Sequence, residues 1–231
     1  MKQTAVVLFT GDVRREERRK NLPRRFLAAL HASVAGGVAS LDGCDLFVRG
    51  DDRGLPNVCE RFDARGPVSD QVSEIVALLF ERGYARVVLL AGDVCRFAPK
   101  LLADSIATLK DTAPRAVIGR SGDGGFYLAG FNRRPDIAWH ALPWFQPTIA
   151  ERLEEELQVH GFELTRAPDV DDIDARDDAE RLLAQPGLIA RCLRAVLRSL
   201  LAAVTITRTP ELLRPLLLIA PPYRRPPPRP R

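Results

Sequence analysis

The stretch VVLLAGDVCRF, residues 87–97, predicts how the chain folds. Four apolar residues in succession, Val87–Leu90, are typical of a strand that is buried on both faces, as in a parallel sheet. The strand is followed by Gly92 and by an acid, Asp93. Open α/β sheets bind ligands at the carboxyl ends of their strands, so Asp93 is well placed to hold a hard cation such as Mg²⁺ or Mn²⁺. A helix cap or a turn would use the same acid, and the local sequence does not choose between these roles.

Similar apolar runs recur on both sides of this stretch. We expect further strands at 5–9, 44–48, 115–118, 126–131 and 162–166, with helices around 26–34, 72–79, 101–109, 149–159 and 177–184. Strands that alternate with helices predict an α/β layer fold with right-handed crossovers.

The charge of the chain is unevenly distributed. The 231 residues carry a formal net charge of +4, with basic clusters at 14–25 and 221–231 and an acidic segment at 169–180. A basic excess favours anionic partners, most often phosphate. The sequence has no aromatic platform or recognised motif for nucleic acid, so we do not expect nucleic acid as a partner.

Cysteine usage and hydropathy indicate a cytoplasmic protein. The four cysteines are scattered without a CxxC pair, which argues for reduced thiols. The apolar start of the chain is too short for a signal peptide, and no run approaches the roughly 20 apolar residues that span a bilayer. The composition changes after residue 186, which divides the chain into a domain at 1–185 and a basic helix with a Pro/Arg-rich tail at 186–231. The oligomeric state stays open, a homodimer included.

The second informative stretch is VIGRSGDGGFYLAGF, residues 117–131. Its glycines allow close approach to a ligand, and Arg120 and Asp123 could position a hydroxylated or phosphorylated group. The stretch is neither a P-loop nor a dinucleotide fingerprint. Taken alone, GDGG is most often an ordinary turn.

The third stretch is DVDDIDARDDAE, residues 169–180. In an extended segment Asp172 and Asp174 project to the same side and could complete a metal site that Asp93 begins. A solvated loop before a helix explains the same residues more simply. The spacing is not that of an EF-hand.

Taken in order, VVLLAGDVCRF, VIGRSGDGGFYLAGF, LPWFQP and DVDDIDARDD resemble a bacterial GT-A-like glycosyltransferase family. This family is the former DUF2064, of the arsenosugar-biosynthesis type, and is similar to the molybdenum cofactor guanylyltransferases and to phospholactate guanylyltransferase. The resemblance covers about residues 4–184. It implies a three-layer GT-A-like nucleotide-diphospho-sugar transferase fold with a mostly parallel central sheet.

The resemblance also implies roles for single residues. Asp93 and Asp123 would be catalytic, and Asp93, Asp172 and Asp174 would hold Mg²⁺ or Mn²⁺. Thr10, Gly11, Arg14, Arg15 and Lys20 would bind the nucleotide phosphates, and Arg120, Gly124, Gly125 and Trp144 would bind substrate. The sequence departs from the family at residues 11–26, where relatives carry a Lys-Thr-Arg-Leu element, and at Cys95, where they carry Pro.

Three functions are consistent with these residues. The first is metal-dependent glycosyl transfer from a nucleotide sugar to a small-molecule acceptor, because a divalent ion stabilises a leaving diphosphate. The second is nucleotidyl transfer, of the guanylyl or cytidylyl type, to a phosphorylated small molecule. The third is a catalytically idle scaffold that binds partners through its basic helix and tail. Trp139 and Trp144 could stack on a base or sugar, although packing against the sheet is the simpler expectation, and His31 is expected in a helix in a surface or structural role.

Overall fold

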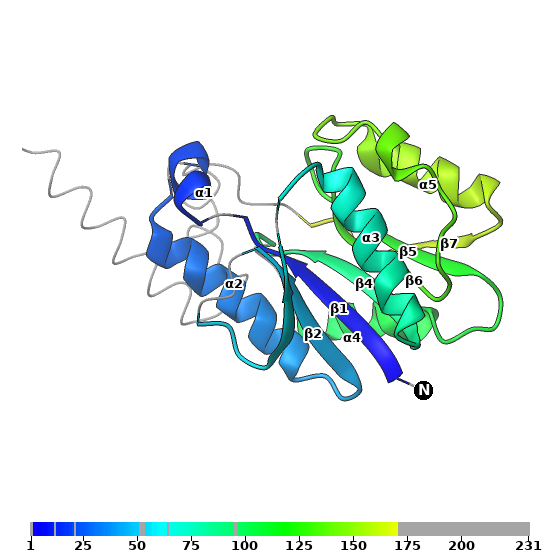
Figure 1. The fold of residues 1–231 in the computed structure, drawn as a ribbon, viewed down its shortest axis with the longest axis horizontal. Coiled ribbons are helices and arrows are strands. Elements are labelled where there is room, and N and C mark those ends of the chain that lie inside the picture. Colours follow the sequence, from blue (N-terminus) through cyan, green and yellow to red (C-terminus); the bar gives the residue numbers. More distant parts are fainter. Residues whose placement is uncertain are drawn as a thin grey trace, which may run out of the picture.

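The computed structural model describes residues 2–11, 13–20, 22–50, 54–63, 65–94 and 97–170, without the side chains of residues 2 and 13–16. Figure 1 shows these residues in colour. The helices expected at 177–184 and after residue 186, and the domain boundary itself, lie outside the described residues.

Seven strands form one sheet within the described residues. They are β1 (Lys2–Phe9), β2 (Cys44–Arg49), β3 (Val58–Phe62), β4 (Tyr84–Ala91), β5 (Arg115–Arg120), β6 (Phe126–Phe131) and β7 (Glu163–Arg166). Their order across the sheet is β3-β2-β1-β4-β6-β5-β7. β6 runs antiparallel to β4 and β5, and the other neighbours are parallel. The prediction of an α/β fold with a mostly parallel sheet is confirmed.

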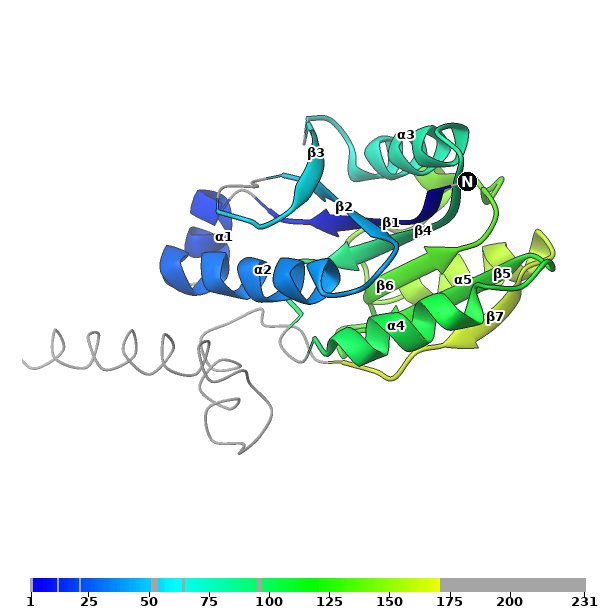
Figure 2. The same cartoon turned by 90° about the horizontal axis from the view of Figure 1, so that it is seen from below.

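Helices cover both faces of the sheet and make three layers. The described helices are α1 (Val13–Lys20), α2 (Arg24–Ala39), α3 (Val68–Glu81), α4 (Pro99–Thr108), α5 (Ile149–Val159) and the 3₁₀ helix η1 (Trp139–Ala141). α2 and α4 pack on one face, and α3, α5 and η1 pack on the other. Figure 2 shows α2 and α4 below the sheet and α3 above it.

The central strands are buried on both faces, as their continuous apolar runs predict. In β4, Val87 and Leu89 point into the core beneath α3, whereas Val88 and Leu90 point into the core beneath α2 and α4. All four side chains are at most 2% exposed. Each contributes about 1.5–3 kcal/mol relative to an exposed position, so β4 is a rigid support for the residues that follow it.

Three elements were not expected from the sequence, namely the 3₁₀ helix η1, the strand β3 and the helix α1. β3 is a short edge strand whose residues alternate between half-buried and exposed. α1 carries charged residues around most of its circumference, so it lacks the apolar stripe by which a helix is recognised. α1 packs on α2, with Glu17 4.0 Å from Arg24.

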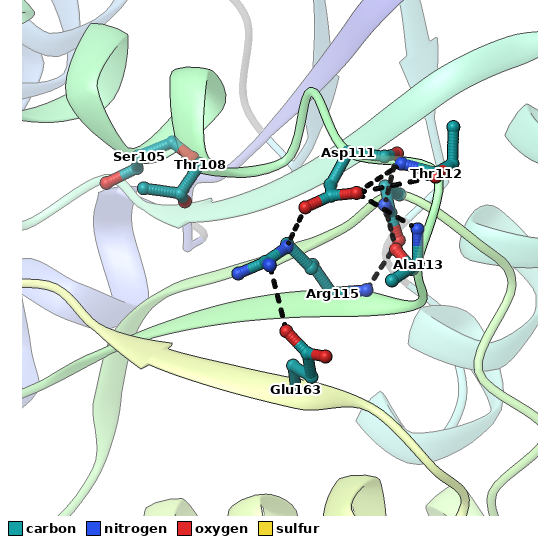
Figure 3. Close-up of polar contacts among 8 residues, drawn as sticks. Ser105, Thr108, Asp111, Thr112, Ala113, Arg115 and Glu163 are labelled. Carbon is teal, nitrogen blue, oxygen red and sulfur yellow. Dashed lines mark hydrogen bonds and ion pairs between the residues drawn. The ribbon is translucent and has the colours of Figure 1, made fainter.

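A polar network fixes the amino end of β5 (Figure 3). The Arg115 side chain donates to Asp111 at 2.7 Å and forms an ion pair with Glu163 of β7 at 2.9 Å. The backbone amide of Ala113, the Arg115 guanidinium and the amide of Thr112 together lower the pKa of Asp111. This network ties β5 to β7 at the end of the sheet opposite to Asp93.

Helices long and apolar enough to cross a membrane are absent from the described part of the chain. This finding agrees with the hydropathy of the sequence.

The carboxyl end of β4 packs closely against β1 and α2. The Gly92 amide donates to the Phe9 carbonyl oxygen at 2.9 Å. A Cβ atom on Gly92 would lie 2.9 Å from that oxygen and 2.9 Å from Cδ2 of His31. His31 is 4% exposed in α2, so its role is structural. Gly92 therefore permits the close approach of backbone that the sequence suggested.

We predict that Gly92→Ala lowers the free energy of unfolding by about 1–3 kcal/mol, because the Phe9 carbonyl belongs to a fixed strand and cannot move aside. Urea denaturation measures the change. The matched control is Gly36→Ala in α2, where a Cβ meets no atom within 4 Å. The control should raise stability by up to about 1 kcal/mol, as alanine does in a helix interior. Equal stability of Gly92→Ala and the wild type would contradict this account of the β4 end.

Candidate active site

A cavity of about 490 Å³ opens at the carboxyl edge of the sheet. Its lining comes from the ends of β1 and β4, from the loop between β5 and β6, from the first turns of α3 and from residues 144–149. Two acids, Asp93 and Asp123, line it together. The crevice in which open α/β sheets bind ligands lies at this edge.

The Asp93 carboxylate is bound to Lys20. The ammonium Nζ of Lys20 lies 2.6 Å from Oδ2 of Asp93. The Lys20 side chain is fully buried, while that of Asp93 is 30% exposed toward the cavity. Burying an ammonium costs several kcal/mol unless it is paired, so this ion pair holds both the C-terminal end of α1 and the carboxylate in place. Asp93 thus lies directly after β4, as expected, and its carboxylate forms an ion pair with Lys20.

Asp123 is held inside a tight turn between β5 and β6. Its Oδ1 atom accepts a hydrogen bond from the Ser121 hydroxyl at 2.6 Å and another from the Gly125 amide at 2.9 Å. Partial burial raises the pKa of Asp123, but these two bonds and the positive charge of Lys20 outweigh burial and lower it overall. Asp123 is therefore ionised at neutral pH and fixed in orientation.

The SGDGG turn is packed against the segment that follows η1. Gly124 has a φ of +86°, and a Cβ atom there would lie 1.9 Å from the carbonyl oxygen of Pro147. The Ala150 amide donates to the Gly124 carbonyl at 3.3 Å. Only glycine fits at position 124, so here GDGG is more than an ordinary turn. Gly125 lines the cavity.

Trp144 lines the cavity and is fixed on two sides. Its indole Nε1 donates to the Trp139 carbonyl at 2.7 Å, and its ring meets Phe126 edge-on with centroids 6.3 Å apart. Trp139 is 4% exposed and packs edge-on against Phe131 in the core. Trp139 therefore packs in the core, as the simpler expectation had it, whereas Trp144 lines the cavity.

Arg120 does not line the cavity. Its guanidinium makes two hydrogen bonds to Glu154 of α5, at 2.9 and 2.8 Å, and Arg166 of β7 binds the same carboxylate at 2.7 Å. The Glu154 side chain is only 7% exposed. Arg120 is thus paired with Glu154 in this structure, and the substrate contact expected of it stays a prediction.

The predicted phosphate contacts Thr10, Gly11 and Lys20 are not among the described residues that line the cavity. Thr10 is buried, with its amide bonded to the Arg49 carbonyl at 3.0 Å, and Gly11 is half-buried beside it. Arg14 and Arg15 lie in α1, and their side chains are outside the described atoms. From the same helix Arg19 lines the cavity.

Asp172 and Asp174 lie outside the described residues. The chain leads toward the cavity before them, since Val170 pairs in parallel with Ser121 of the SGDGG turn. Within the described part of the chain, no three His, Cys, Asp or Glu side chains are grouped as metal ligands. Asp93 and Asp123 are the carboxylates among the described residues that line the cavity.

Sequence reasoning missed several residues of the site. Ser121 holds Asp123, His31 packs against Gly92, and Phe126, Tyr127 and Phe145 line the cavity. The S-x-D-G-G spacing could have predicted the role of Ser121, because serine side chains often form hydrogen bonds within turns. Nothing in the sequence marks His31 or Phe145, since their positions depend on packing between distant segments.

One family profile matches the chain. It describes an uncharacterized protein conserved in bacteria (DUF2064). The match covers residues 49–146, a range that includes Asp93, Asp123 and Trp144. It ends before Asp172 and Asp174. No curated protein matches the chain.

Solved structures share the fold. A protein assigned as a nucleotide-diphospho-sugar transferase, from Desulfovibrio desulfuricans G20, is 20% identical with a TM-score of 0.70, covering 89% of this chain and 98% of that one. Rv0371c from Mycobacterium tuberculosis H37Rv is 17% identical with a TM-score of 0.50, covering 80% and 99%. CMP:2-keto-3-deoxy-manno-octonic acid synthetase, complexed with CTP, is 14% identical with a TM-score of 0.50, covering 86% and 99%. The chain has the nucleotide-diphospho-sugar transferase fold, as predicted.

We predict that Glu154→Gln lowers the free energy of unfolding by about 2 kcal/mol at neutral pH, because it weakens charge-assisted bonds to Arg120 and Arg166. Burial raises the pKa of Glu154, but the two arginines outweigh it and lower the value below the usual 4.5. The stabilisation is therefore present above pH 4.5 and is lost as the pH falls through the lower value of the folded state. Urea denaturation at a series of pH values should show the gap between wild type and variant narrowing in acid.

The matched control is Glu155→Gln, on the same helix. Glu155 pairs with Arg152 at the surface, where both side chains are about half exposed. An exposed pair of this kind contributes at most about 1 kcal/mol. If Glu154→Gln were no more destabilising than Glu155→Gln at neutral pH, the Arg120–Glu154–Arg166 cluster would not hold β5, α5 and β7 together.

Proposed function

We propose that this protein is a metal-dependent transferase that uses a nucleotide-activated donor, and that it transfers a glycosyl group from a nucleotide sugar to a small-molecule acceptor. The observation that supports this proposal most is that Asp93 and Asp123 line one cavity on the carboxyl edge of the sheet, with the buried ammonium of Lys20 bound to Asp93. Each comes from a different segment, and the fold brings them together.

The charge of this group favours a divalent cation. Two carboxylates and one ammonium leave one negative charge in excess at the polar end of the cavity. A divalent cation would turn that excess into a positive charge, which suits the diphosphate of a donor. Arg19, which lines the same cavity, adds a further positive group.

The residues present fit Mg²⁺ or Mn²⁺, because hard cations prefer carboxylate oxygens. Asp93 can accept the Lys20 hydrogen bond and bind a cation at once, since a carboxylate offers about four acceptor positions. Asp172 and Asp174 remain the proposed further ligands, with substrate oxygens. When bound, the cation would neutralise the charge that develops on the leaving diphosphate.

The residues of the chain would bind and orient the substrates. The loop of Thr10 and Gly11, with Arg14 and Arg15, would contact the donor phosphates. In the transfer the acceptor oxygen forms a bond to the sugar carbon, and the bond from that carbon to the diphosphate breaks. The electron pair leaves with the nucleotide diphosphate, and Asp123, which is ionised, would accept the hydroxyl proton.

Nucleotidyl transfer is the second candidate, because a CTP complex of a synthetase shares this fold. The two reactions release different products. Glycosyl transfer releases a nucleoside diphosphate, whereas nucleotidyl transfer from a triphosphate to a phosphorylated acceptor releases pyrophosphate. Assaying both products in one reaction mixture separates the candidates.

We predict that wild-type protein binds a UDP-, GDP- or CDP-linked sugar in the presence of Mn²⁺, and that Asp93→Asn weakens this binding at least about tenfold, since even outer-shell groups of metal sites contribute 10–100-fold. Isothermal titration measures the affinity. The control is Asp104→Asn, because Asp104 makes an exposed ion pair with Lys100 on α4.

A double variant separates loss of ligand binding from loss of the folded structure. Asp93→Asn leaves the buried ammonium of Lys20 without its carboxylate, whereas Asp93→Asn with Lys20→Met removes both charges. Circular dichroism should show both proteins folded. Folded wild type that binds none of the three sugar nucleotides, or Asp93→Asn that binds as the wild type does, would overturn the proposal.

A further inference from the structure

We propose that the acceptor is an uncharged hydroxyl compound with an apolar ring, and that the exposed ring of Phe145 stacks on it at the mouth of the cavity. This inference rests on the proposed function, because it names the acceptor of the same site. It is drawn from the apolar wall of the cavity, from the scarcity of positive charge in its described lining and from the backbone of Phe145.

The cavity has a polar end and an apolar wall. Asp93 and Asp123 lie at the polar end, whereas Val72, Leu89 and Phe126 contribute apolar surface from α3, β4 and β6. Ile149 and Trp144 extend this surface. These side chains project from regular elements or are fixed by hydrogen bonds, so the wall is preformed. A preformed apolar wall with few polar groups favours a ligand that is itself largely apolar.

The described lining holds little positive charge for a phosphorylated acceptor. Among the lining residues that the structure describes, Arg19 alone carries a positive charge. The nearby ammonium of Lys20 is engaged with Asp93. The first turn of α3, which reaches the cavity at Val68, contains an acid, Asp70. In the proposed reaction the cation and Arg19 would be balanced by the donor diphosphate, so a second phosphate, on the acceptor, would meet two carboxylates with little compensation, which disfavours it.

Phe145 is held in an unfavourable position. Its side chain is 87% exposed, and its φ of +62° lies in the left-handed region that residues other than glycine seldom adopt. The neighbours fix it there, because Trp144 is bonded to the Trp139 carbonyl, the Gln146 amide donates to the Pro143 carbonyl and Pro147 packs on Gly124. An exposed aromatic ring on a strained backbone at a cavity mouth indicates a ligand contact.

The shape of the cavity indicates how Phe145 would contact the acceptor. An aromatic ring at the mouth offers a flat face to a ring-shaped ligand, and the apolar wall accommodates the body of that ligand. The hydroxyl group of the ligand would then point toward Asp123 and Asp93 at the polar end.

The test uses three small probes and needs no donor or metal. They are 4-nitrophenyl glucoside, methyl glucoside, which lacks the aromatic ring, and 4-nitrophenyl phosphate, which has the ring and a charge. Isothermal titration gives the affinities, and quenching of tryptophan fluorescence by the nitrophenyl group in a Trp139→Phe variant, in which Trp144 is the remaining tryptophan, locates the ligand in the cavity. We expect the nitrophenyl glucoside to bind at least about tenfold more tightly than the other two.

Variants of Phe145 test the stacking. Phe145→Ala should weaken binding of 4-nitrophenyl glucoside about tenfold, and Phe145→Tyr should retain it. The matched control is Val159→Ala, because Val159 is also an exposed apolar side chain, at 80%, but lies at the last position of α5 outside the cavity. Phe145→Gly should raise the melting temperature, since glycine tolerates a positive φ, while it weakens binding. That combination separates a ligand contact from a structural role.

Three results would overturn the inference. They are tighter binding of 4-nitrophenyl phosphate than of the glucoside, equal binding by Phe145→Ala and wild type, and no binding of any probe. The result is independent of donor binding. If the sugar-nucleotide titrations fail while the glucoside binds and depends on Phe145, the transferase proposal falls and the ring site stands.

Discussion

The ion pair between Lys20 and Asp93 is the interaction on which the rest of the site depends. It places a fully buried ammonium 2.6 Å from a carboxylate that follows the central strand β4. The ammonium would not be favourable there alone, because desolvation of a buried ion costs several kcal/mol. The pair therefore fixes the end of α1 over the edge of the sheet and orients Asp93 before any ligand arrives. Since β4 is buried on both faces, this arrangement rests on the most rigid part of the fold.

The charge and polarity of the cavity depend on the residues around this ion pair. Asp123 is fixed by Ser121 and Gly125 and feels the charge of Lys20, so the two acids and the ammonium form one electrostatic unit. In our proposal a cation would bind to the excess negative charge of that unit, and the apolar wall beyond it would favour a largely apolar ligand. Charge at one end and apolar surface at the other would separate the donor phosphates from the body of the acceptor.

The sequence predicted the parts of this structure that depend on local pattern. Continuous apolar runs predicted the central strands, and Asp93 lies directly after β4 as expected, whereas its ligand-binding role stays a prediction. The GDGG stretch was correctly placed between two strands. Long-range packing was not predictable. α1 has no apolar stripe that would mark it as a helix. Arg120 binds Glu154, a carboxylate 34 positions away in the chain. Phe145 has a φ of +62°, and its exposed position depends on the contacts of its neighbours. The predicted roles of Asp172 and Asp174 stay predictions, because both residues lie outside the described part of the chain.

The most direct test of the account is a crystal of the full chain soaked with Mn²⁺ and a nucleoside diphosphate. Anomalous scattering from manganese locates the ion without reference to any assumed site. The account predicts a peak against the Asp93 carboxylate, with the diphosphate beside it and Lys20 still bonded to Asp93. Manganese and nucleotide bound elsewhere on the molecule, with the carboxylates of Asp93 and Asp123 untouched, would contradict it.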